Sequence, residues 1–266
     1  MTKNTGHSSD SKVDAFDKRA QKLSKDRISL YNDASEHYPY VREKERQIVV
    51  DQLRLSPNQD ICDAGAGGAY LSEGIEKALN GKCNITCIEN SRNYFDTIPA
   101  RYNKFLSSLN RIELPDSTFD RIGVLAGLHH MEYKADFFGE AYRMLRTSGR
   151  LVVADVQSDT PPAYFLNGPV DKFNPIGHDG RFFNKGEMSD LCRAAGFSQV
   201  GEMLCQFDWE FPDRQTLVEY CKALFGMARA SLDEVEAAVN EYLEVYNTTQ
   251  GVALGWSLVT VCADKA

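Results

Sequence analysis

A glycine-rich turn between an apolar run and a helical pattern constrains the fold of this chain more than any other feature. The run Ile61–Ala69 reads I-C-D-A-G-A-G-G-A, so an apolar segment ends in an acid and is followed by three glycines. Glycine lacks the Cβ atom that would keep a ligand away from the backbone, and it tolerates the positive φ angles of tight strand-to-helix turns. The run predicts a βα unit whose turn approaches a ligand closely, with a merely connecting turn as the alternative.

Two common glycine-rich motifs do not fit this turn. A dinucleotide-binding G-x-G-x-x-G fingerprint would need glycine at the position of Tyr70. A Walker A loop would need Gly-Lys followed by Ser or Thr at the start of the helix, and these residues do not follow. The ligand is therefore expected to differ from those of both motifs.

The composition favours a globular protein that acts on a small molecule. The 266 residues, 42% of them hydrophobic, suit one large domain or one domain with a cap. No apolar run reaches the roughly 18 residues of a membrane helix, and residues 1–14 lack a signal-peptide core, so we expect a cytoplasmic location and no membrane partner. The net charge of −8 offers no basic surface to long nucleic acids, so we expect no nucleic-acid partner.

The cysteines indicate neither disulfides nor a metal site. The chain has seven cysteines and no C-x-x-C pair. The closest pair, Cys83 and Cys87, belongs to an apolar, strand-like run, where a cysteine acts as a small hydrophobic side chain. We therefore predict no metal in this protein.

Strand and helix patterns alternate from residue 60 onward, which predicts an open, doubly wound α/β sheet with parallel strands. A long proline-containing loop, 157–184, interrupts this alternation, and loops of that length are often functional. The expected strands are 60–64, 85–89, 105–109, 119–126, 150–156, 198–210 and 252–262. The expected helices include 69–80, 134–146, 185–195, 213–226 and 231–247.

Five segments, in order, make the chain resemble the class I S-adenosylmethionine-dependent methyltransferases that act on small molecules. Besides the turn, which resembles the D-x-G-x-G loop of that family, these segments are Ile88-Glu89, Leu114–Asp120, Arg143–Asp155 and Ala194–Phe197. The resemblance covers roughly residues 36–200. It implies a Rossmann-like, seven-stranded sheet whose last strand is antiparallel, with an N-terminal helical lid and inserted cap elements.

The chain departs from the family pattern at several positions. Ala69 stands where many members have a third glycine, Thr147-Ser148 replaces Pro-Gly, and Asn110 stands where an acid is common. Ala69 keeps the small size needed beside the helix start, and the amide of Asn110 could still contact adenine.

The resemblance also implies a domain organisation. The expected N-terminal helical lid is 15–56 and the expected methyltransferase domain is 57–266. Within that domain, 157–184 form a substrate loop and 213–247 a helical insertion. Composition, rich in Ser, Lys, Asp and Asn, predicts a disordered tail over residues 1–14.

The resemblance implies S-adenosylmethionine as the methyl donor and S-adenosylhomocysteine as the product. Glu89 would end the strand adjacent to that of Asp63, where its carboxylate can accept hydrogen bonds from both ribose hydroxyls, with a solvated strand end as the alternative. Asp63 would lie near the methionine amino group. The expected cofactor-binding residues are Tyr38, Arg42, Asp63, Ala64, Gly65, Ala66, Gly67, Glu89, Asn90, Asn110, Arg111, Ala126 and Gly127.

Methyl transfer needs little covalent help from the protein, because a methyl sulfonium is already activated and in-line displacement mainly requires close positioning in a dry site. A base is needed when the acceptor atom is protonated, and histidine suits that role. His129 and His130 are the catalytic candidates, with packing as the alternative role. Candidate substrate contacts are Tyr164, Phe173, His178 and Arg181, with a polar surface turn or core packing as alternatives.

We therefore expect an enzyme that methylates O, N or C of a small organic acceptor, as a monomer or homodimer. Methylation of nucleic-acid bases is disfavoured, because Gly127–His130 reads G-L-H-H and not Asn/Asp-Pro-Pro-aromatic. Methylation of a protein or of RNA is a third alternative. The alternative from another class is a protein that binds S-adenosylmethionine without transferring its methyl group.

Overall fold

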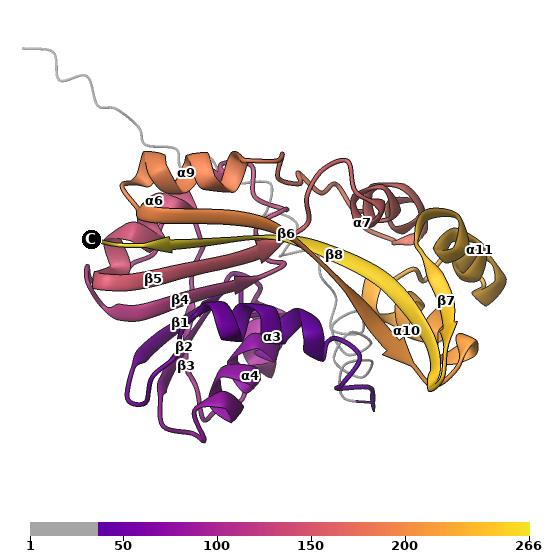
Figure 1. Ribbon diagram of the computed structural model, residues 1–266, viewed down its shortest axis with the longest axis horizontal. Helices are drawn as coiled ribbons and strands as arrows, with labels where there is room; N and C mark the ends of the chain where they lie inside the picture. The colour runs from indigo at the N-terminus through magenta and orange to yellow at the C-terminus, as the bar shows by residue number, and fades with distance from the viewer. Residues whose placement is uncertain (1–36) are drawn as a thin grey trace, which may run out of the picture.

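The computed structural model describes residues 37–266, which form one mixed sheet with helices on both faces (Figure 1). The expected tail, 1–14, and the first part of the expected lid lie outside the described residues. The strands are β1 (Asp60–Ala64), β2 (Asn84–Glu89), β3 (Asn103–Leu106), β4 (Phe119–Leu125), β5 (Leu145–Asp155), β6 (Ser198–Phe211), β7 (Val245–Thr248) and β8 (Gly251–Asp264). The helices are α3 (Glu43–Gln52), α4 (Tyr70–Ala78), α5 (Arg92–Thr97), α6 (Lys134–Met144), α7 (Pro161–Phe165), α8 (Asp171–Phe173), α9 (Glu187–Ala195), α10 (Arg214–Phe225) and α11 (Leu232–Tyr242), with a π-helix at Leu166–Val170.

The strand order confirms the predicted doubly wound sheet. The order is β3-β2-β1-β4-β5-β8-β6, in which β1 to β5 pair in parallel and β8 lies antiparallel between β5 and β6. The chain reverses its winding direction between β1 and β4, and this is the point where open α/β sheets bind ligands at the carboxyl ends of their strands.

Side chains alternate between two cores, as the two-residue period of a strand requires. In β5, Val152 and Ala154 join the core under α3 and α4, whereas Leu151 and Val153 join the core under α6 and α9. Both faces of the sheet are therefore buried, which explains why the central strands read as nearly continuous apolar runs.

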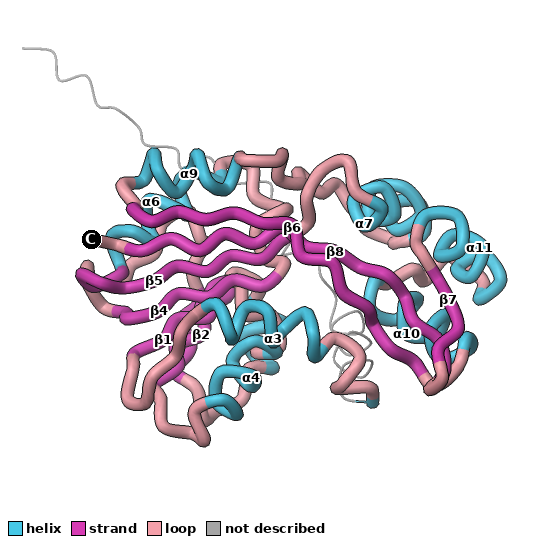
Figure 2. The backbone as a smooth tube through the Cα atoms, in the orientation of Figure 1, coloured by secondary structure: helices cyan, strands magenta, loops and turns pink. Residues whose placement is uncertain are grey.

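The two longest strands extend beyond the carboxyl edge of the parallel sheet. β6 and β8 have 14 residues each and their outer halves pair with each other, while the outer half of β8 also pairs with β7 (Figure 2). Helices α7 and α10 pack on this part, and α11 packs on these two helices. We call the outer halves of β6 and β8, together with β7, α7, α10 and α11, the extension lobe.

The extension lobe contains the main departures from the expected elements. Segment 157–184, expected as a loop, contains α7, the π-helix and α8, because Pro161 and Pro162 occupy the first turn of a helix, where a missing N–H costs nothing. The helix expected over 231–247 ends at Tyr242, and Val245–Thr248 pairs with β8 as an eighth strand. Within residues 37–266, no helix combines the length and the apolar character needed to cross a lipid bilayer.

Candidate active site

A cavity of about 270 Å³ lies between the carboxyl edge of the parallel strands and the extension lobe. Its wall combines the glycine turn (residues 65–69) and the ends of β1, β2 and β4 with residues of α3, the π-helix, β6, α10 and β8. Predicted site residues on this wall are Arg42, Asp63, Gly65, Ala66, Gly67, Glu89, Asn90, Ala126, Gly127, His129, His130 and His178.

The glycine turn has the backbone geometry that its sequence predicts. Gly65 and Gly67 have φ angles of +72° and +54°, which glycine adopts without a steric penalty. The N–H groups of Gly65 and Ala66 both donate to the carbonyl of Ile88, at 2.8 and 3.1 Å, which fixes the turn against β2. Ala69 has a φ angle of +71°, in the left-handed region. The glycine common at this position therefore suits the backbone conformation as well as the small size that was predicted to matter.

Glu89 connects the end of β2 to the glycine turn. Its carboxylate accepts hydrogen bonds from the N–H of Gly67 at 2.8 Å and of Ser91 at 2.7 Å. The side chain is 4% exposed, and burial raises its pKa against the lowering effect of these backbone donors. Each carboxylate oxygen can accept more than one hydrogen bond, so the group can also bind ligand hydroxyls.

Asp63 is a second buried carboxylate on the same wall. Its Oδ2 accepts from the N–H and the hydroxyl of Ser72, at 3.0 and 2.7 Å, which ties the end of β1 to α4. Burial raises the pKa of Asp63 to about 6, although the two hydrogen bonds from Ser72 oppose this shift. A cationic group in the cavity would favour the ionised carboxylate.

Tyr70 lines the cavity, although it was not predicted as a site residue. Arg46 and Arg42 lie over its ring, 4.3 and 5.1 Å from the centroid, and Arg42 also lies 5.7 Å from the ring centroid of Trp209. The Tyr70 hydroxyl is buried and has no hydrogen-bond partner among the described residues. Such a group is costly unless a ligand satisfies it.

Three histidines also line the cavity. His129 and His130 follow β4, and His178 follows α8; we call these three the histidine cluster. Nδ1 of His129 lies 2.7 Å from Oδ1 of Asp155, which is fully buried. Burial alone would raise the pKa of Asp155, but the charge of His129 and hydrogen bonds from His129, Val156 and Leu128 outweigh it and lower the pKa.

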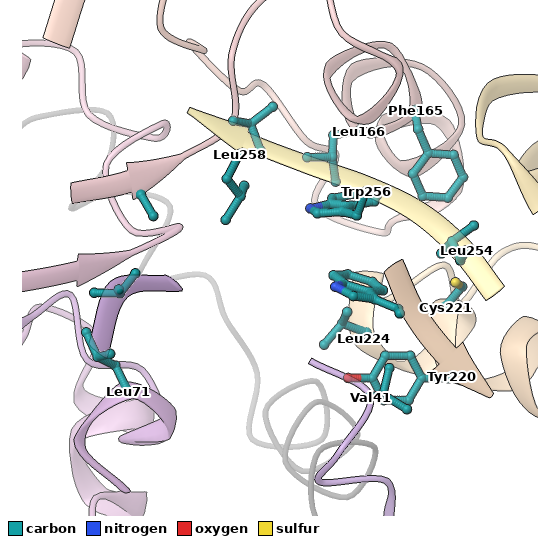
Figure 3. Packing of buried hydrophobic residues seen from close by; sticks show 14 of the residues in the cluster. Val41, Leu71, Phe165, Leu166, Tyr220, Cys221, Leu224, Leu254, Trp256 and Leu258 are labelled. Atoms are coloured by element: carbon teal, nitrogen blue, oxygen red, sulfur yellow. The ribbon is translucent and has the colours of Figure 1, made fainter. Parts of the chain in front are cut away.

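The wall opposite the glycine turn is apolar and aromatic. The rings of Trp209 and Trp256 stack with centroids 4.6 Å apart, and Phe225 stacks on both. Leu71 lies on one side of the cavity and Leu224 on the other (Figure 3). We call the wall formed by Leu166, Val170, Trp209, Leu224, Phe225, Trp256 and Leu258 the aromatic chamber. Trp209 Nε1 is buried there without a hydrogen-bond partner among the described residues.

Several predicted cofactor residues lie off this wall in the part of the chain that the structure describes. Ala64 is buried within β1, and Tyr38 packs against the rings of Tyr40 and Tyr220. Asn110 contacts the hydroxyl of Ser108 through its side chain. Arg111 is exposed and lies in the loop after β3, which ends at Leu106.

Of the four predicted substrate residues, His178 lines the cavity and the other three do not. His178 lies on the wall, whereas Tyr164 is 54% exposed and donates to Asp159. Phe173 packs against the core of the extension lobe. The side chain of Arg181 lies near Glu132, at 3.8 Å, and only its backbone reaches the histidine cluster, where its N–H donates to the His129 carbonyl at 2.6 Å.

Comparisons with known proteins agree with this geometry. The family described as the methyltransferase domain matches residues 62–153. Phosphoethanolamine N-methyltransferase 3 of Arabidopsis thaliana is 24% identical over 157 residues, which are 57% of this chain and 31% of that protein. This chain therefore spans less than a third of the length of that relative, 31%.

Solved structures share the fold at low sequence identity. A Thermotoga maritima protein, described as an S-adenosylmethionine-dependent methyltransferase and possible histamine N-methyltransferase, has a TM-score of 0.62 at 16% identity and covers 93% of this chain and 100% of its own. The [4+2]-cyclase SpnF has a TM-score of 0.56 at 15% identity, over 84% of this chain and 80% of its own. Residues 62–153 of this chain thus match the methyltransferase domain family, and the described residues share the fold of these solved structures.

Proposed function

We propose that this protein transfers the methyl group of S-adenosylmethionine to a small acceptor with an apolar or aromatic body. The observation that carries the proposal is the single cavity that joins the glycine turn and the carboxylates of Asp63 and Glu89 to the aromatic chamber. One side of this cavity suits a polar, cationic cofactor, and the other side suits an apolar molecule.

The residues on the polar side fit S-adenosylmethionine. The glycine turn allows close backbone approach, Glu89 can accept from ribose hydroxyls, and Asp63 offers a carboxylate to the ammonium group. The buried Tyr70 hydroxyl is a donor that a ligand would satisfy. When bound, the cofactor supplies an activated methyl group, so the protein has to hold the acceptor in line and exclude water.

The aromatic chamber supports a small acceptor over a macromolecular one. Trp209 is 1% exposed and Trp256 is 6% exposed, so an acceptor there would lose most of its contact with water. The orphaned Trp209 N–H offers one hydrogen bond that would orient a polar atom of the acceptor. We assign the activation of the acceptor atom to the histidine cluster, which lines the cavity beside Ala126 and Gly127.

The test is formation of S-adenosylhomocysteine from S-adenosylmethionine with a panel of apolar amines, phenols and thiols. Amines come first, because the names of the Arabidopsis relative and the Thermotoga neighbour both specify N-methylation. Product with at least one acceptor, lost in Glu89→Gln, supports the proposal. Tight cofactor binding with no product across the panel would refute it.

That refuting result would favour the second candidate, a protein that binds the cofactor without transferring its methyl group. The observation in its favour is that a protein named as a [4+2]-cyclase has the same fold. An apolar wall beside a cofactor would promote such a reaction by holding a substrate in a reactive shape. Conversion of a substrate with S-adenosylmethionine unconsumed would identify it.

A further inference from the structure

The histidine cluster has the composition and spacing of a metal centre. One potential ligand atom from each of His129, His130 and His178 lies within 4.8 Å of those of the other two. The ring centroids are 4.2 to 5.5 Å apart. The two segments that supply the cluster are held together by the hydrogen bond from the Arg181 N–H to the His129 carbonyl. The cluster is therefore part of the fold's packed structure.

The ring of His129 is oriented by a hydrogen bond to a carboxylate, as the rings of metal-binding histidines usually are. Oδ1 of Asp155 lies 2.7 Å from Nδ1 of His129, and the N–H groups of Leu128 and Val156 donate to the same carboxylate at 2.8 and 2.7 Å. An anionic carboxylate accepts, so Nδ1 carries the proton and Nε2 presents its lone pair when the ring is neutral. Metal-bound histidines commonly donate their other N–H to a carboxylate or carbonyl in this way, which orients the ring.

A neutral amide holds His178 in the same tautomer. The Nδ2 of Asn167 donates to the Gly180 carbonyl at 2.7 Å, which identifies Oδ1 as the acceptor atom. This Oδ1 accepts from the Gly180 N–H at 2.8 Å and lies 3.1 Å from Nδ1 of His178. An amide oxygen only accepts, so Nδ1 of His178 is the donor and Nε2 again presents the lone pair.

We propose that His129, His130 and His178 bind one divalent transition-metal ion, and that zinc is the preferred metal. Imidazole nitrogen is a favoured zinc ligand, and three protein ligands with one open position are typical of catalytic zinc sites. Zn–N bonds of about 2.0 to 2.1 Å place tetrahedral ligand atoms about 3.4 Å apart, so small side-chain rotations would close the present spacing around the ion. The prediction of no metal follows from cysteine spacing, which carries no information about histidines that the fold brings together.

If the protein transfers a methyl group as proposed, the metal site would also affect which acceptors bind. The cluster lines the same cavity as Ala126, Gly127 and the aromatic chamber. The open coordination position of the metal would therefore face the acceptor. This arrangement selects acceptors whose polar atom is a metal ligand, such as a hydroxyl or thiol attached to an apolar body.

Metal binding can be measured without cofactor or acceptor, which separates this proposal from the proposed function. The untagged full chain would be treated with a chelator, dialysed and titrated with Co²⁺, whose visible absorption reports tetrahedral nitrogen coordination, and then with Zn²⁺ in competition. We expect one metal ion per chain. His178→Ala should lower the affinity at least 100-fold, and Asn167→Ala, which removes only the group that orients His178, about 10- to 100-fold.

The matched control is His37→Ala, because His37 is exposed and outside the cluster. It should bind the metal like the unaltered chain. Circular dichroism and thermal unfolding would establish that the His178 and Asn167 variants remain folded. The proposal is overturned if the unaltered chain takes up no Co²⁺ or Zn²⁺, or if His178→Ala and His129→Ala, both folded, bind as tightly as His37→Ala.

Discussion

The carboxylate of Glu89, at the end of β2, accepts a hydrogen bond from the backbone N–H of Gly67, in the turn after β1, at 2.8 Å. One side chain therefore both shapes the glycine turn and presents its remaining lone pairs to the cavity. Because Ser91 also donates to Glu89, the residue joins three backbone segments at the carboxyl edge of the sheet. Any change at Glu89 should act on the cofactor side of the cavity.

Replacing Glu89 by glutamine should weaken S-adenosylmethionine binding by about 10- to 100-fold. Glutamine keeps the size of the side chain, but an NH₂ group replaces one of the two oxygens that accept from Gly67 and Ser91, so one of these hydrogen bonds is lost. The substitution also removes the negative charge that strengthens hydrogen bonds from ribose hydroxyls. Isothermal titration calorimetry would measure the affinity, with thermal unfolding as the check on folding. A matched control is Glu73→Gln on the exposed side of α4, which should leave the affinity unchanged. Equal affinities for the two variants would contradict the cofactor assignment.

The affinity for S-adenosylmethionine should decrease as the pH falls through about 6. Burial raises the pKa of Asp63 from 3.8 to about 6, so below pH 6 the unliganded protein carries a proton on this carboxyl that a cationic ligand must displace. Binding at pH 5.5 should therefore release a proton, and binding at pH 7.5 should not. Calorimetry in buffers of different ionisation enthalpy measures this release directly.

The raised pKa of Asp63 also determines how the free energy of unfolding changes with pH. Between pH 3.8 and 6 the folded, unliganded protein holds a proton on Asp63 that the unfolded chain has lost, so this group makes the free energy of unfolding fall as the pH rises through that window. Asp63→Asn should remove both the proton release and this slope. Ser72→Ala, which deletes a hydroxyl donor to the carboxylate, should move the midpoint of the affinity change to higher pH. A proton release that persists in Asp63→Asn would assign it to another group.

The sequence predicts the polar half of this site well and the apolar half poorly. Asp63, Gly65, Gly67 and Glu89 belong to short motifs whose spacing follows from one βαβ unit, so local patterns are enough to place them at one edge of the sheet. The same patterns do not show how the chain runs after β3, which ends at Leu106, so they do not fix the place of Asn110 relative to the cavity wall.

The aromatic chamber depends on long-range pairing that no local pattern encodes. Trp209 pairs with Leu254, and Phe207 with Trp256, only because β6 and β8 stay paired far beyond the parallel sheet. The histidine cluster is similar, since His178 reaches His129 only after α7, the π-helix and α8 have formed within a segment that reads as a loop. In sequence, these residues are equally consistent with core packing.

Replacing Trp209 by phenylalanine should raise the KM for the acceptor about 5- to 10-fold and change kcat little. The variant removes the buried Nε1 donor, whose hydrogen bond to an acceptor would be worth about 1 kcal/mol in ground state and transition state alike. Steady-state kinetics with the best acceptor from the panel would give both constants. Trp256→Phe removes a similar ring area from the same stack and is the matched control. If both variants raise KM equally, ring area and not the N–H determines acceptor binding.

Replacing Gly251 by alanine should destabilise the extension lobe by about 3 kcal/mol or more. Gly251 begins β8 with φ +144°, a conformation that side-chain-bearing residues rarely adopt, and an added Cβ would lie 2.1 Å from the Phe211 carbonyl oxygen and 2.6 Å from that of Pro212. These carbonyls belong to the end of β6 and the residue after it, so relief of the clash would separate the strands that carry Trp209 and Trp256.

Gly201→Ala is the matched control for this prediction, because Gly201 lies in β6 and an added Cβ there would meet no atom within 4 Å. Urea unfolding followed by tryptophan fluorescence would compare the two, since the chain's two tryptophans, Trp209 and Trp256, both report on the extension lobe. Gly201→Ala should change the free energy of unfolding by about 0.5 kcal/mol or less. Equal stability of the two variants would mean that the start of β8 can rearrange without separating β6 from β8, and that the aromatic chamber does not depend on this glycine.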